Sequence, residues 1–315
     1  MVIKECVDLI LTLSCQNRCT FCLQPHMKRQ IVMPPGRVDR LLRKARALGA
    51  KIVLTGGEPT LYPDFFEVVA KCRGLAFERI GVVTNARRCA ELGFARRVLE
   101  SGIQQIGISV HSHVPAAHDA MTGVPGSLKE TCRGVANLLA LKNAQGRGVS
   151  IWVGIVLGAE NAGHVPETIR RLSRMGVRSF IVSEVLAKDG REMARYPVVR
   201  RMYRELASRP EFRRLDICLA GFPACLFEPV TPKGDGDWTL RSSNGAQITM
   251  EPVRDDSPDN TLNPGYEIDG AYFEVRSLFT QEPPPCRACS WKELCFGVPK
   301  VYAERFEAEG VGWLA

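Results

Sequence analysis

The chain repeats one pattern six times before residue 209: a short apolar segment of strand length, then a longer segment with helical periodicity. The strand-like segments are residues 7–13, 51–54, 79–84, 105–110, 149–157 and 179–184. The helix-like segments are residues 34–48, 63–72, 91–101, 128–143, 165–175 and 196–208, with apolar residues recurring three or four positions apart. Six consecutive βα units indicate a parallel sheet with right-handed crossovers. An open doubly wound sheet and a partial barrel both satisfy this pattern.

The chain is long enough for one large α/β domain and a smaller appendage. Of its 315 residues, 45% are hydrophobic and 24% are charged, which is ordinary globular composition and excludes a mainly disordered chain. After residue 209 the alternation stops. Residues 231–263 are rich in Gly, Asp, Ser, Asn and Pro, and a hairpin is expected within 237–250. We therefore predict two domains, residues 1–208 and residues 209–315.

Composition also limits location and partners. Glu5 and Asp8 interrupt the N-terminal apolar stretch, and the apolar run 151–159 is too short to cross a membrane. We predict a cytoplasmic protein with no membrane partner, in which clustered cysteines bind metal or do redox work more often than they form disulfides. The net charge of +8 is spread along the chain, and no basic stripe with interleaved aromatics favours nucleic acid as a partner.

Three cysteines follow the first predicted strand in a C-x3-C-x2-C spacing: Cys15, Cys19 and Cys22. The carboxyl ends of strands are where parallel α/β folds build their active sites. A loop with three thiolates can hold three irons of a four-iron cluster and leave the fourth iron open to another ligand. A zinc site with a distant fourth ligand and a set of unrelated buried cysteines are the alternatives.

A glycine turn, Gly56-Gly57-Glu58-Pro59, follows the second predicted strand. Two glycines let a backbone approach a ligand closely and leave carbonyl groups exposed as acceptors, and Glu58 adds a carboxylate. Together these groups suit an ammonium ion, although most Gly-Gly pairs are only turns.

The two motifs together resemble the radical S-adenosylmethionine (radical SAM) superfamily, as does Phe21 before the third cysteine. The resemblance covers residues 7–205 and implies a partial (βα)6 TIM-type barrel. It implies that the three cysteines bind a [4Fe–4S] cluster, that the methionine part of SAM chelates the open iron, and that Gly56, Gly57 and Glu58 hold the methionine ammonium. It also implies the reaction, in which reductive cleavage of SAM yields a 5′-deoxyadenosyl radical that abstracts hydrogen from a substrate C–H bond.

Further positions at strand ends resemble SAM contacts of the same family. Thr84 and Asn85 follow the third strand and are expected near the SAM pocket. Ser109 ends the fourth strand at a position that resembles a ribose contact, and residues 156–161 are expected beside the adenine. For each of them, a side chain that only caps its strand end is an equally good interpretation.

A second cysteine group lies far downstream, with Cys286, Cys289 and Cys295 in a C-x2-C-x5-C spacing and Cys218 and Cys225 upstream. A zinc ribbon and an iron–sulfur cluster both use such spacing. Beside a radical SAM core, the group resembles the auxiliary-cluster extensions called SPASM and Twitch domains, although no cysteine follows the last one. We predict one auxiliary [4Fe–4S] cluster, completed by one of the two upstream cysteines, with a slight preference for Cys218. If neither cysteine reaches the cluster, one iron stays open and could bind substrate directly.

Two residues at strand ends are candidates for substrate chemistry. Glu184 ends the sixth strand, and His111 follows the fourth strand, where it is either a proton donor or a plain loop residue. Lys188 and Arg191 are candidates to receive a substrate carboxylate. The remaining cysteines are interpreted as packing residues, namely Cys6, Cys72, Cys89 and Cys132.

We expect the substrate to be a peptide or peptide-derived, because relatives with auxiliary-cluster domains mostly modify peptides. A small molecule, such as a sugar, an aminocyclitol or a nucleoside, is the alternative. An electron donor such as flavodoxin or ferredoxin is the expected partner. A non-catalytic iron–sulfur or zinc sensor is a further alternative. A sensor needs no ammonium-binding turn beside its cluster, so this alternative does not explain the glycine turn at residues 56–59.

Overall fold

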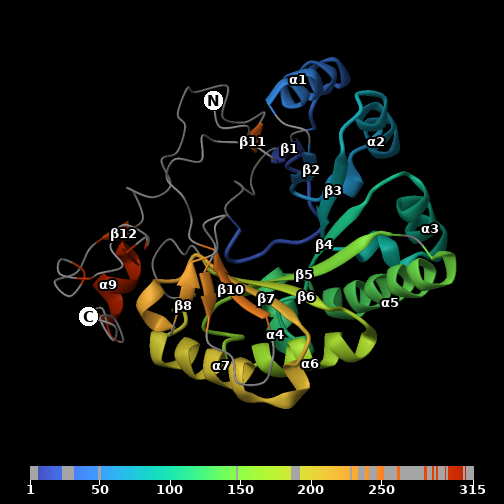
Figure 1. Cartoon of the computed structure of the whole chain (residues 1–315). Coiled ribbons are helices and arrows are strands. Elements are labelled where there is room, and N and C mark those ends of the chain that lie inside the picture. Colours follow the sequence, from blue (N-terminus) through green and yellow to red (C-terminus); the bar gives the residue numbers. More distant parts are fainter. Residues whose placement is uncertain are drawn as a thin grey trace. The chain divides into compact units, whose positions relative to one another are not determined.

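The computed structural model gives most of the chain as helices, strands and defined loops (Figure 1). The residues that it describes are 6–22, 32–48, 51–146, 148–185, 192–227, 229–232, 238–240, 247–251, 261–262, 280–281, 286, 289, 295, 297–307 and 309. The chain forms two compact units. The first comprises residues 1–110, 122–152 and 257–272, and the second comprises residues 111–121, 153–256 and 273–315.

The first unit is a parallel sheet with helices packed against it. Its strands lie in the order β11-β1-β2-β3-β4, and all neighbours run parallel. The strands are β1 (Cys6–Thr12), β2 (Lys51–Gly56), β3 (Arg79–Thr84), β4 (Gln105–Ser109) and β11 (Thr261–Leu262). The helices are α1 (Pro35–Leu48), α2 (Phe65–Gly74), α3 (Leu92–Glu100) and α5 (Ser127–Gln145), with 3₁₀ turns η1 (Pro59–Leu61) and η2 (Arg87–Ala90). Because the strands are parallel, their carboxyl ends share one edge of the sheet.

Hydrophobic periodicity accounts for the core of this unit. In β2 the side chains of Ile52 and Leu54 are fully buried, and their neighbours are less so. Helix α1 buries the residues that share one face of its periodic pattern, namely Val38, Leu41, Leu42 and Ala45. In β4 a glycine is required, because a Cβ atom on Gly107 would lie 2.2 Å from the Trp152 ring.

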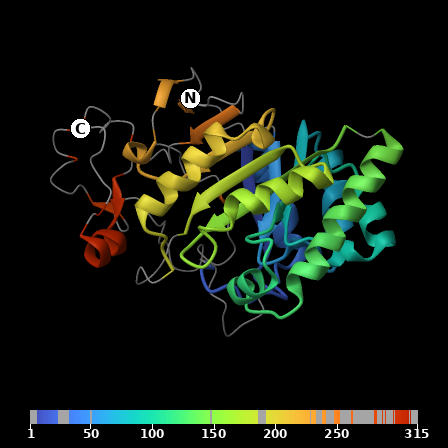
Figure 2. The ribbon, with the colours of Figure 1, turned by 90° about the horizontal axis from the view of Figure 1, so that it is seen from below.

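The second unit continues the alternation of strands and helices. Strands β6 (Ser179–Glu184), β7 (Asp216–Ala220) and β10 (Gln247–Glu251) are parallel neighbours, and β9 (Trp238–Leu240) and β8 (Pro229–Pro232) follow antiparallel. The chain enters this unit within β5 (Ser150–Leu157). Helices α6 (Val165–Met175) and α7 (Tyr196–Ser208) lie together (Figure 2). The other elements are α4 (Pro115–Thr122), α9 (Lys300–Phe306), β12 (Thr280–Gln281), β13 (Val298–Pro299), η3 (Pro210–Phe212) and η4 (Ala224–Leu226).

The six predicted βα units are confirmed, as is the hairpin, in which Thr239 pairs with Thr249. Helix α4 and strand β7 are among the elements that were not predicted. Helix α4 is short and comes between β4 and α5 in the chain, and β7 continues the parallel ladder beside β6 although it follows the predicted boundary at residue 209. The β7 pattern is a half-buried strand, with Ile217 and Leu219 facing the core.

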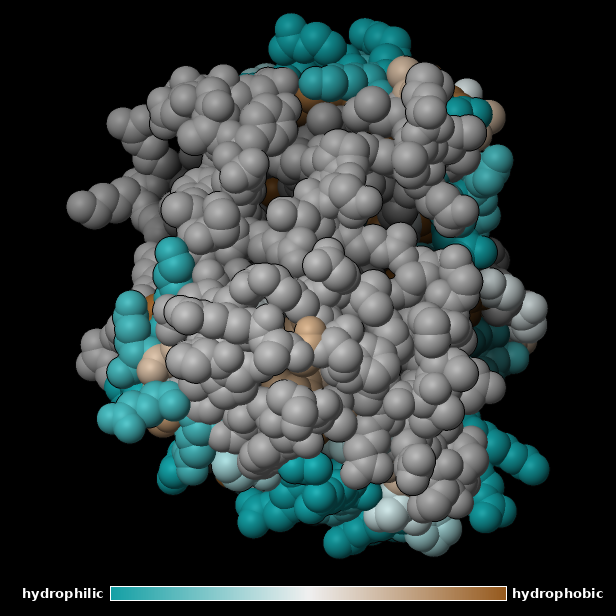
Figure 3. Space-filling view, turned by 60° about the vertical axis from the view of Figure 1, so that its left-hand side comes forward, coloured by the Kyte–Doolittle hydropathy of each residue, from teal (hydrophilic) through white to brown (hydrophobic). Residues whose placement is uncertain are grey.

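The described surface carries the charged faces of these helices, and Figure 3 shows mainly hydrophilic side chains where the face that it presents is described. Among the described helices, none is both long and apolar enough to cross a membrane. Lys188, Arg191 and most of the polar segment 231–282 lie outside the described residues.

Candidate active site

The three cysteines of the first motif lie on the loop that leaves the carboxyl end of β1. None of the three forms a disulfide, and the loop turns tightly, with the Cys22 amide donating to the Cys19 carbonyl at 3.2 Å. Burial raises the pKa of Cys15 to about 11 and that of Cys19 to about 12, and the negative charges of the neighbouring thiolates add to both shifts. The sulfur atoms are therefore close enough to interact electrostatically. A bound metal removes the free-energy cost of ionising these thiols, because a coordinated thiol is deprotonated.

The spacing of these thiols suits a cluster better than a single ion. Among the residues that the structure describes, no three His, Cys, Asp or Glu side chains converge to hold one metal ion. In an iron–sulfur cubane each thiolate binds a different iron, so the ligand sulfurs stay apart. The loop therefore fits a [4Fe–4S] cluster, to which it can supply one thiolate for each of three irons.

The glycine turn after β2 packs directly on the backbone that leads into Cys15. The Gly57 amide donates to the Thr12 carbonyl at 2.7 Å, and the Glu58 amide donates to the Ser14 carbonyl at 2.8 Å. A Cβ atom on Gly56 would lie 2.3 Å from the Thr12 oxygen, and one on Gly57 would lie 2.4 Å from the Ser14 oxygen. Sequence reasoning assigned the glycines to the approach of a ligand. In the structure they also allow two protein backbones to meet.

The Glu58 carboxylate is fully buried and joins the ends of β2 and β3. Its Oε1 accepts the Thr60 amide at 3.1 Å, the Thr60 hydroxyl at 2.6 Å and the Thr84 hydroxyl at 2.7 Å. Its Oε2 accepts the Asn85 amide at 2.7 Å. Burial raises the pKa of Glu58, and these four hydrogen bonds oppose the increase. The described contacts of this carboxylate are thus to the protein, and they fix the loop that presents the glycine turn.

Asn85 links the end of β3 to the cluster loop. Its side-chain amide donates to Cys15 Sγ at 3.8 Å, and its Oδ1 accepts from Gln16 Nε2 at 3.1 Å and from the Arg87 amide at 3.0 Å. The Arg87 guanidinium in turn donates to the Gln16 carbonyl at 3.1 Å and to Asn17 Oδ1 at 2.8 Å. Sequence reasoning singled out Asn85 but missed Gln16 and Arg87, for which the sequence carries no motif.

The structure thus brings together the predicted residues of the first unit, from Cys15 to Asn85, at one edge of the sheet. Ser109 ends β4 in the same unit and is half-buried. Its predicted ribose contact stays a prediction.

His111 lies in a hydrogen-bonded network in the second unit. The ring is 4% exposed, and its Nδ1 accepts the Val156 amide at 3.2 Å. The His111 amide donates to Nδ1 of His118, and the two rings stack with centroids 5.5 Å apart. Burial lowers the pKa of His111 to about 3, so the ring is neutral at physiological pH.

Asn161 fixes the segment predicted to lie beside the adenine. Its amide nitrogen donates to the His111 carbonyl at 2.6 Å and to the Val156 carbonyl at 2.8 Å, and its oxygen accepts the Gly158 amide at 2.8 Å. All three bonds join residues of the second unit, and they hold this segment in a turn.

Glu184 ends β6 and is buried at 8% exposure. Within the described part of the chain, its Oε2 has no hydrogen-bond partner. Burial raises the pKa of Glu184 to about 8, which leaves the carboxyl mostly protonated at neutral pH. The Tyr196 hydroxyl lies close to this carboxyl. Burial raises the pKa of the Tyr196 phenol, and the negative charge of Glu184 raises it further.

The cysteines of the second group are all in the second unit. The Ala224 amide donates to Cys295 Sγ at 3.3 Å, which places this thiol beside the turn that carries the buried Cys225. The Cys289 amide donates to the Cys286 carbonyl at 3.2 Å. Cys218 lies in β7, in register with Ile181 and Thr249 of the neighbouring strands.

A protein-family comparison identifies the first half of this arrangement. Residues 9–172, slightly more than half of the chain, match the family described as the radical SAM superfamily. The chain belongs to the radical SAM superfamily. Its cofactors are accordingly SAM and the [4Fe–4S] cluster that the cysteine loop fits.

Related proteins of known name share this part of the chain. A probable GTP 3′,8-cyclase of Thermococcus kodakarensis is 27% identical over 196 residues, covering 61% of this chain and 60% of that protein. The GTP 3′,8-cyclase of Klebsiella pneumoniae (strain 342) is 38% identical over 122 residues, covering 36% of each. The chain thus spans less than two thirds of the length of either relative.

A solved structure shows the same fold over almost the whole chain. Streptococcus suis SuiB bound to S-adenosylmethionine superposes with a TM-score of 0.62 at 16% identity, over 96% of this chain and 74% of SuiB. SuiB has also been solved with its precursor peptide SuiA. The likeness confirms the predicted fold class, an α/β partial barrel of the radical SAM type.

Proposed function

We propose that this radical SAM enzyme acts on a small molecule, with a purine nucleotide as the first candidate. The connection of Asn85 and the glycine turn to Cys15 supports SAM cleavage. The names of the two cyclase relatives favour the small-molecule alternative over the peptide substrate that the sequence led us to expect. Likeness to a peptide-bound neighbour at 16% identity supports only the fold.

The residues of the first unit position the cofactors. Cys15, Cys19 and Cys22 would hold the cluster, and the backbone of Gly56 and Gly57 would contact the methionine part of SAM. The Asn85 amide orients Cys15 through its hydrogen bond to sulfur. When bound, the cluster and SAM supply a 5′-deoxyadenosyl radical. The protein excludes water and holds the substrate C–H bond in place.

In the second unit we assign the substrate contact to Glu184. A buried, protonated carboxyl can both donate and accept a hydrogen bond without placing a negative charge near the radical. The neighbouring Tyr196 hydroxyl is the group that interacts with this carboxyl, but neither that hydroxyl nor Oε2 makes a well-formed hydrogen bond within the described part of the chain. This supports the role, since a buried polar atom is normally satisfied and a substrate group supplies a partner.

We further propose that Cys286, Cys289, Cys295 and Cys225 hold one auxiliary [4Fe–4S] cluster. The hydrogen bond from Ala224 to Cys295 Sγ supports Cys225 over Cys218, the cysteine that sequence reasoning preferred. A cytoplasmic location fits this chemistry, because reduced thiols are needed to assemble both clusters.

The test is anaerobic SAM cleavage by the reconstituted enzyme. 5′-Deoxyadenosine released with dithionite is quantified by mass spectrometry with GTP, with other nucleoside triphosphates and with short peptides. We expect a nucleotide to stimulate the release, and Cys22→Ala to abolish it. Stimulation by peptides alone restores the peptide interpretation. No release from protein shown to carry its cluster and to bind SAM contradicts the proposal.

A further inference from the structure

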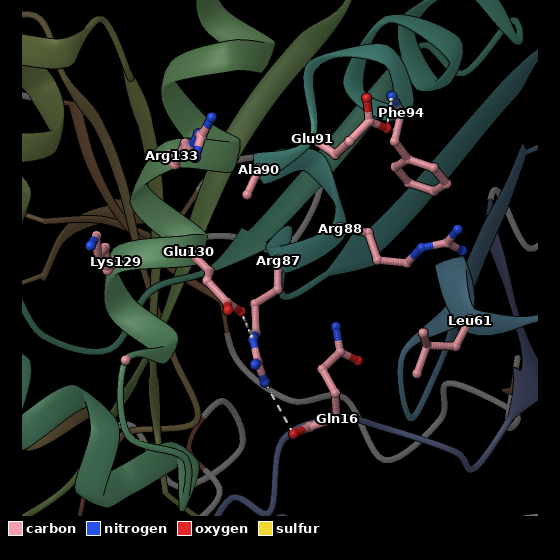
Figure 4. Close-up of a pocket in the computed structure, with 11 residues that line it drawn as sticks. Gln16, Leu61, Arg87, Arg88, Ala90, Glu91, Phe94, Lys129, Glu130 and Arg133 are labelled. Atoms are coloured by element: carbon pink, nitrogen blue, oxygen red, sulfur yellow. Dashed lines mark hydrogen bonds and ion pairs between the residues drawn. The ribbon is translucent and has the colours of Figure 1, made fainter.

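A basic pocket of about 940 Å³ opens beside the cluster loop in the first unit. Its lining comes from the cluster loop, η1, η2, α3 and α5, and Figure 4 shows Arg87 pointing toward Gln16 at its floor. Four cationic side chains line the pocket: Arg87, Arg88, Lys129 and Arg133. Neither the mechanism nor the comparisons assign a role to this surface.

The two carboxylates of the pocket are already engaged. Glu91 caps α3 by accepting the amides of Gly93 at 2.7 Å and Phe94 at 2.6 Å. Glu130 accepts the Arg87 guanidinium at 2.6 Å. The remaining positive charge of the pocket is therefore not neutralised by its own lining.

Three of the cations have no anionic partner within the described part of the chain: Arg88, which donates to the Thr60 carbonyl, Lys129 and Arg133. Lys129 and Arg133 are both exposed on α5. They are four residues apart, so they lie on the same helix face and repel each other by about 0.2–0.5 kcal/mol. This repulsion destabilises the isolated helix. An anionic partner would attract both cations and so make their contribution to the free energy favourable.

The pocket lies next to a cluster ligand. Gln16 lines the pocket and directly follows Cys15 in the chain. Its side-chain amide donates to Asn85, which donates in turn to Cys15 Sγ. Along this path, a molecule seated against Gln16 is separated from the Cys15 sulfur by two residues, Gln16 and Asn85, and by the two hydrogen bonds that they make.

Apolar groups on the same surface favour a protein over a small anion. Leu61 lines the pocket and is 36% exposed, and Leu92, which is 51% exposed, lies in the chain between the lining residues Glu91 and Phe94. The Arg88 guanidinium covers the Phe94 ring at 4.0 Å. Exposed apolar side chains, arginine and an aromatic ring are the composition of protein interfaces.

We propose that this surface docks an acidic protein that carries single electrons. The inference rests on the proposed function, because SAM cleavage requires one electron per turnover from outside the chain. The reduced flavin or iron–sulfur centre of the carrier loses one electron, and the cluster held by the Cys15 loop gains it; no atom is transferred. Opposite charges accelerate such an encounter and align the two centres, and salt weakens it.

The test compares two charge reversals in the reconstituted holoenzyme, with flavodoxin and its NADPH-dependent reductase as the probe. Lys129→Glu with Arg133→Glu alters the pocket. Arg43→Glu with Lys44→Glu, on the exposed face of α1 and outside the pocket, changes the net charge equally. Flavodoxin affinity is measured by titration calorimetry, and 5′-deoxyadenosine release is measured with flavodoxin and, separately, with dithionite.

We expect the pocket variant to bind flavodoxin about tenfold more weakly. Its flavodoxin-driven release falls in parallel, while its dithionite-driven release is unchanged and shows that the variant is folded. The α1 variant keeps the wild-type affinity for flavodoxin and the wild-type release of 5′-deoxyadenosine with either reductant. Equal affinities for the two variants overturn the docking site. Failure of the proposed function is a separate result, because wild-type protein then releases nothing with dithionite whatever its affinity for flavodoxin.

Discussion

At the residue scale, burial determines the charge state of two titratable side chains of the second unit, His111 and Glu184. His111 is neutral because burial, and then the charge of the neighbouring His118, lowers its pKa. Glu184 is mostly protonated because burial raises its pKa, and the interaction with the Tyr196 phenol opposes this increase only in part. A site that handles a carbon radical benefits from neutral neighbours, which do not bring counter-ions and water with them.

The raised pKa of Glu184 predicts a pH-dependent stability. Its folded pKa of about 8 lies above the ordinary value of 4.5, so below pH 4.5 the carboxyl is protonated in both states. As the pH rises from 4.5 to 8, the unfolded state ionises first, and folding loses about 1.4 kcal/mol per pH unit from this group. Above pH 8 both states are ionised and the loss is complete.

Glu184→Gln removes this dependence. We expect the variant to match the wild type near pH 5 and to be more stable at pH 8, as measured by anaerobic urea unfolding across that range. Other titrating groups cancel in the difference between the two proteins. Parallel stability curves would show that the carboxyl already ionises normally in the folded state.

At the scale of elements, the decisive contact is between the loops that follow β1 and β2. Each hydrogen bond between them joins a backbone amide of the glycine turn to a carbonyl just before Cys15. The glycines are needed because the two backbones meet where a Cβ atom has no room. The cluster loop is therefore held in shape by the same turn that we propose as the contact for SAM.

Gly57→Ala should separate the two loops. Its Cβ atom would lie 2.4 Å from the Ser14 oxygen and 2.6 Å from the Leu13 oxygen, both backbone atoms that cannot rotate away. We expect a loss of about 1–3 kcal/mol in stability and a lower iron content after reconstitution. Gly74→Ala, at the end of α2 with open space around it, is the matched control and should be neutral or stabilising by up to about 1 kcal/mol. Normal iron loading of Gly57→Ala would contradict the role of the turn.

The sequence predicted the helices and strands well but the hydrogen bonds between distant residues poorly, for a physical reason. Periodicity and cysteine spacing are local, so the six βα units and the cluster loop follow from short windows. The bond between Asn85 and Cys15 joins residues 70 positions apart, and nothing in either window reports it. The same is true of Arg87 and Glu130 in the basic pocket, and of the bond that places Cys295 beside Cys225.

At the scale of the whole molecule, the chain divides its cysteines between its two units, one group in each. The cysteines interpreted as packing residues differ in how deeply they are buried. Cys72 and Cys89 are fully buried in the first unit, while Cys132 is half-buried. Under the proposed ligand sets, each unit supplies the thiols for one cluster without a ligand from the other, so we expect that the two clusters can be removed independently.

Iron content should therefore distinguish the two candidate fourth ligands of the auxiliary cluster. Two intact [4Fe–4S] clusters give about eight irons per chain. We expect Cys225→Ala to lose up to half of this iron and Cys218→Ala to keep all of it, because Cys225 lies on the turn bonded to Cys295 whereas Cys218 sits inside the β7 ladder. In both variants the first cluster should persist, as shown by undiminished SAM binding. Iron loss from Cys218→Ala alone would reassign the fourth ligand to β7 and place the auxiliary cluster against the sheet itself.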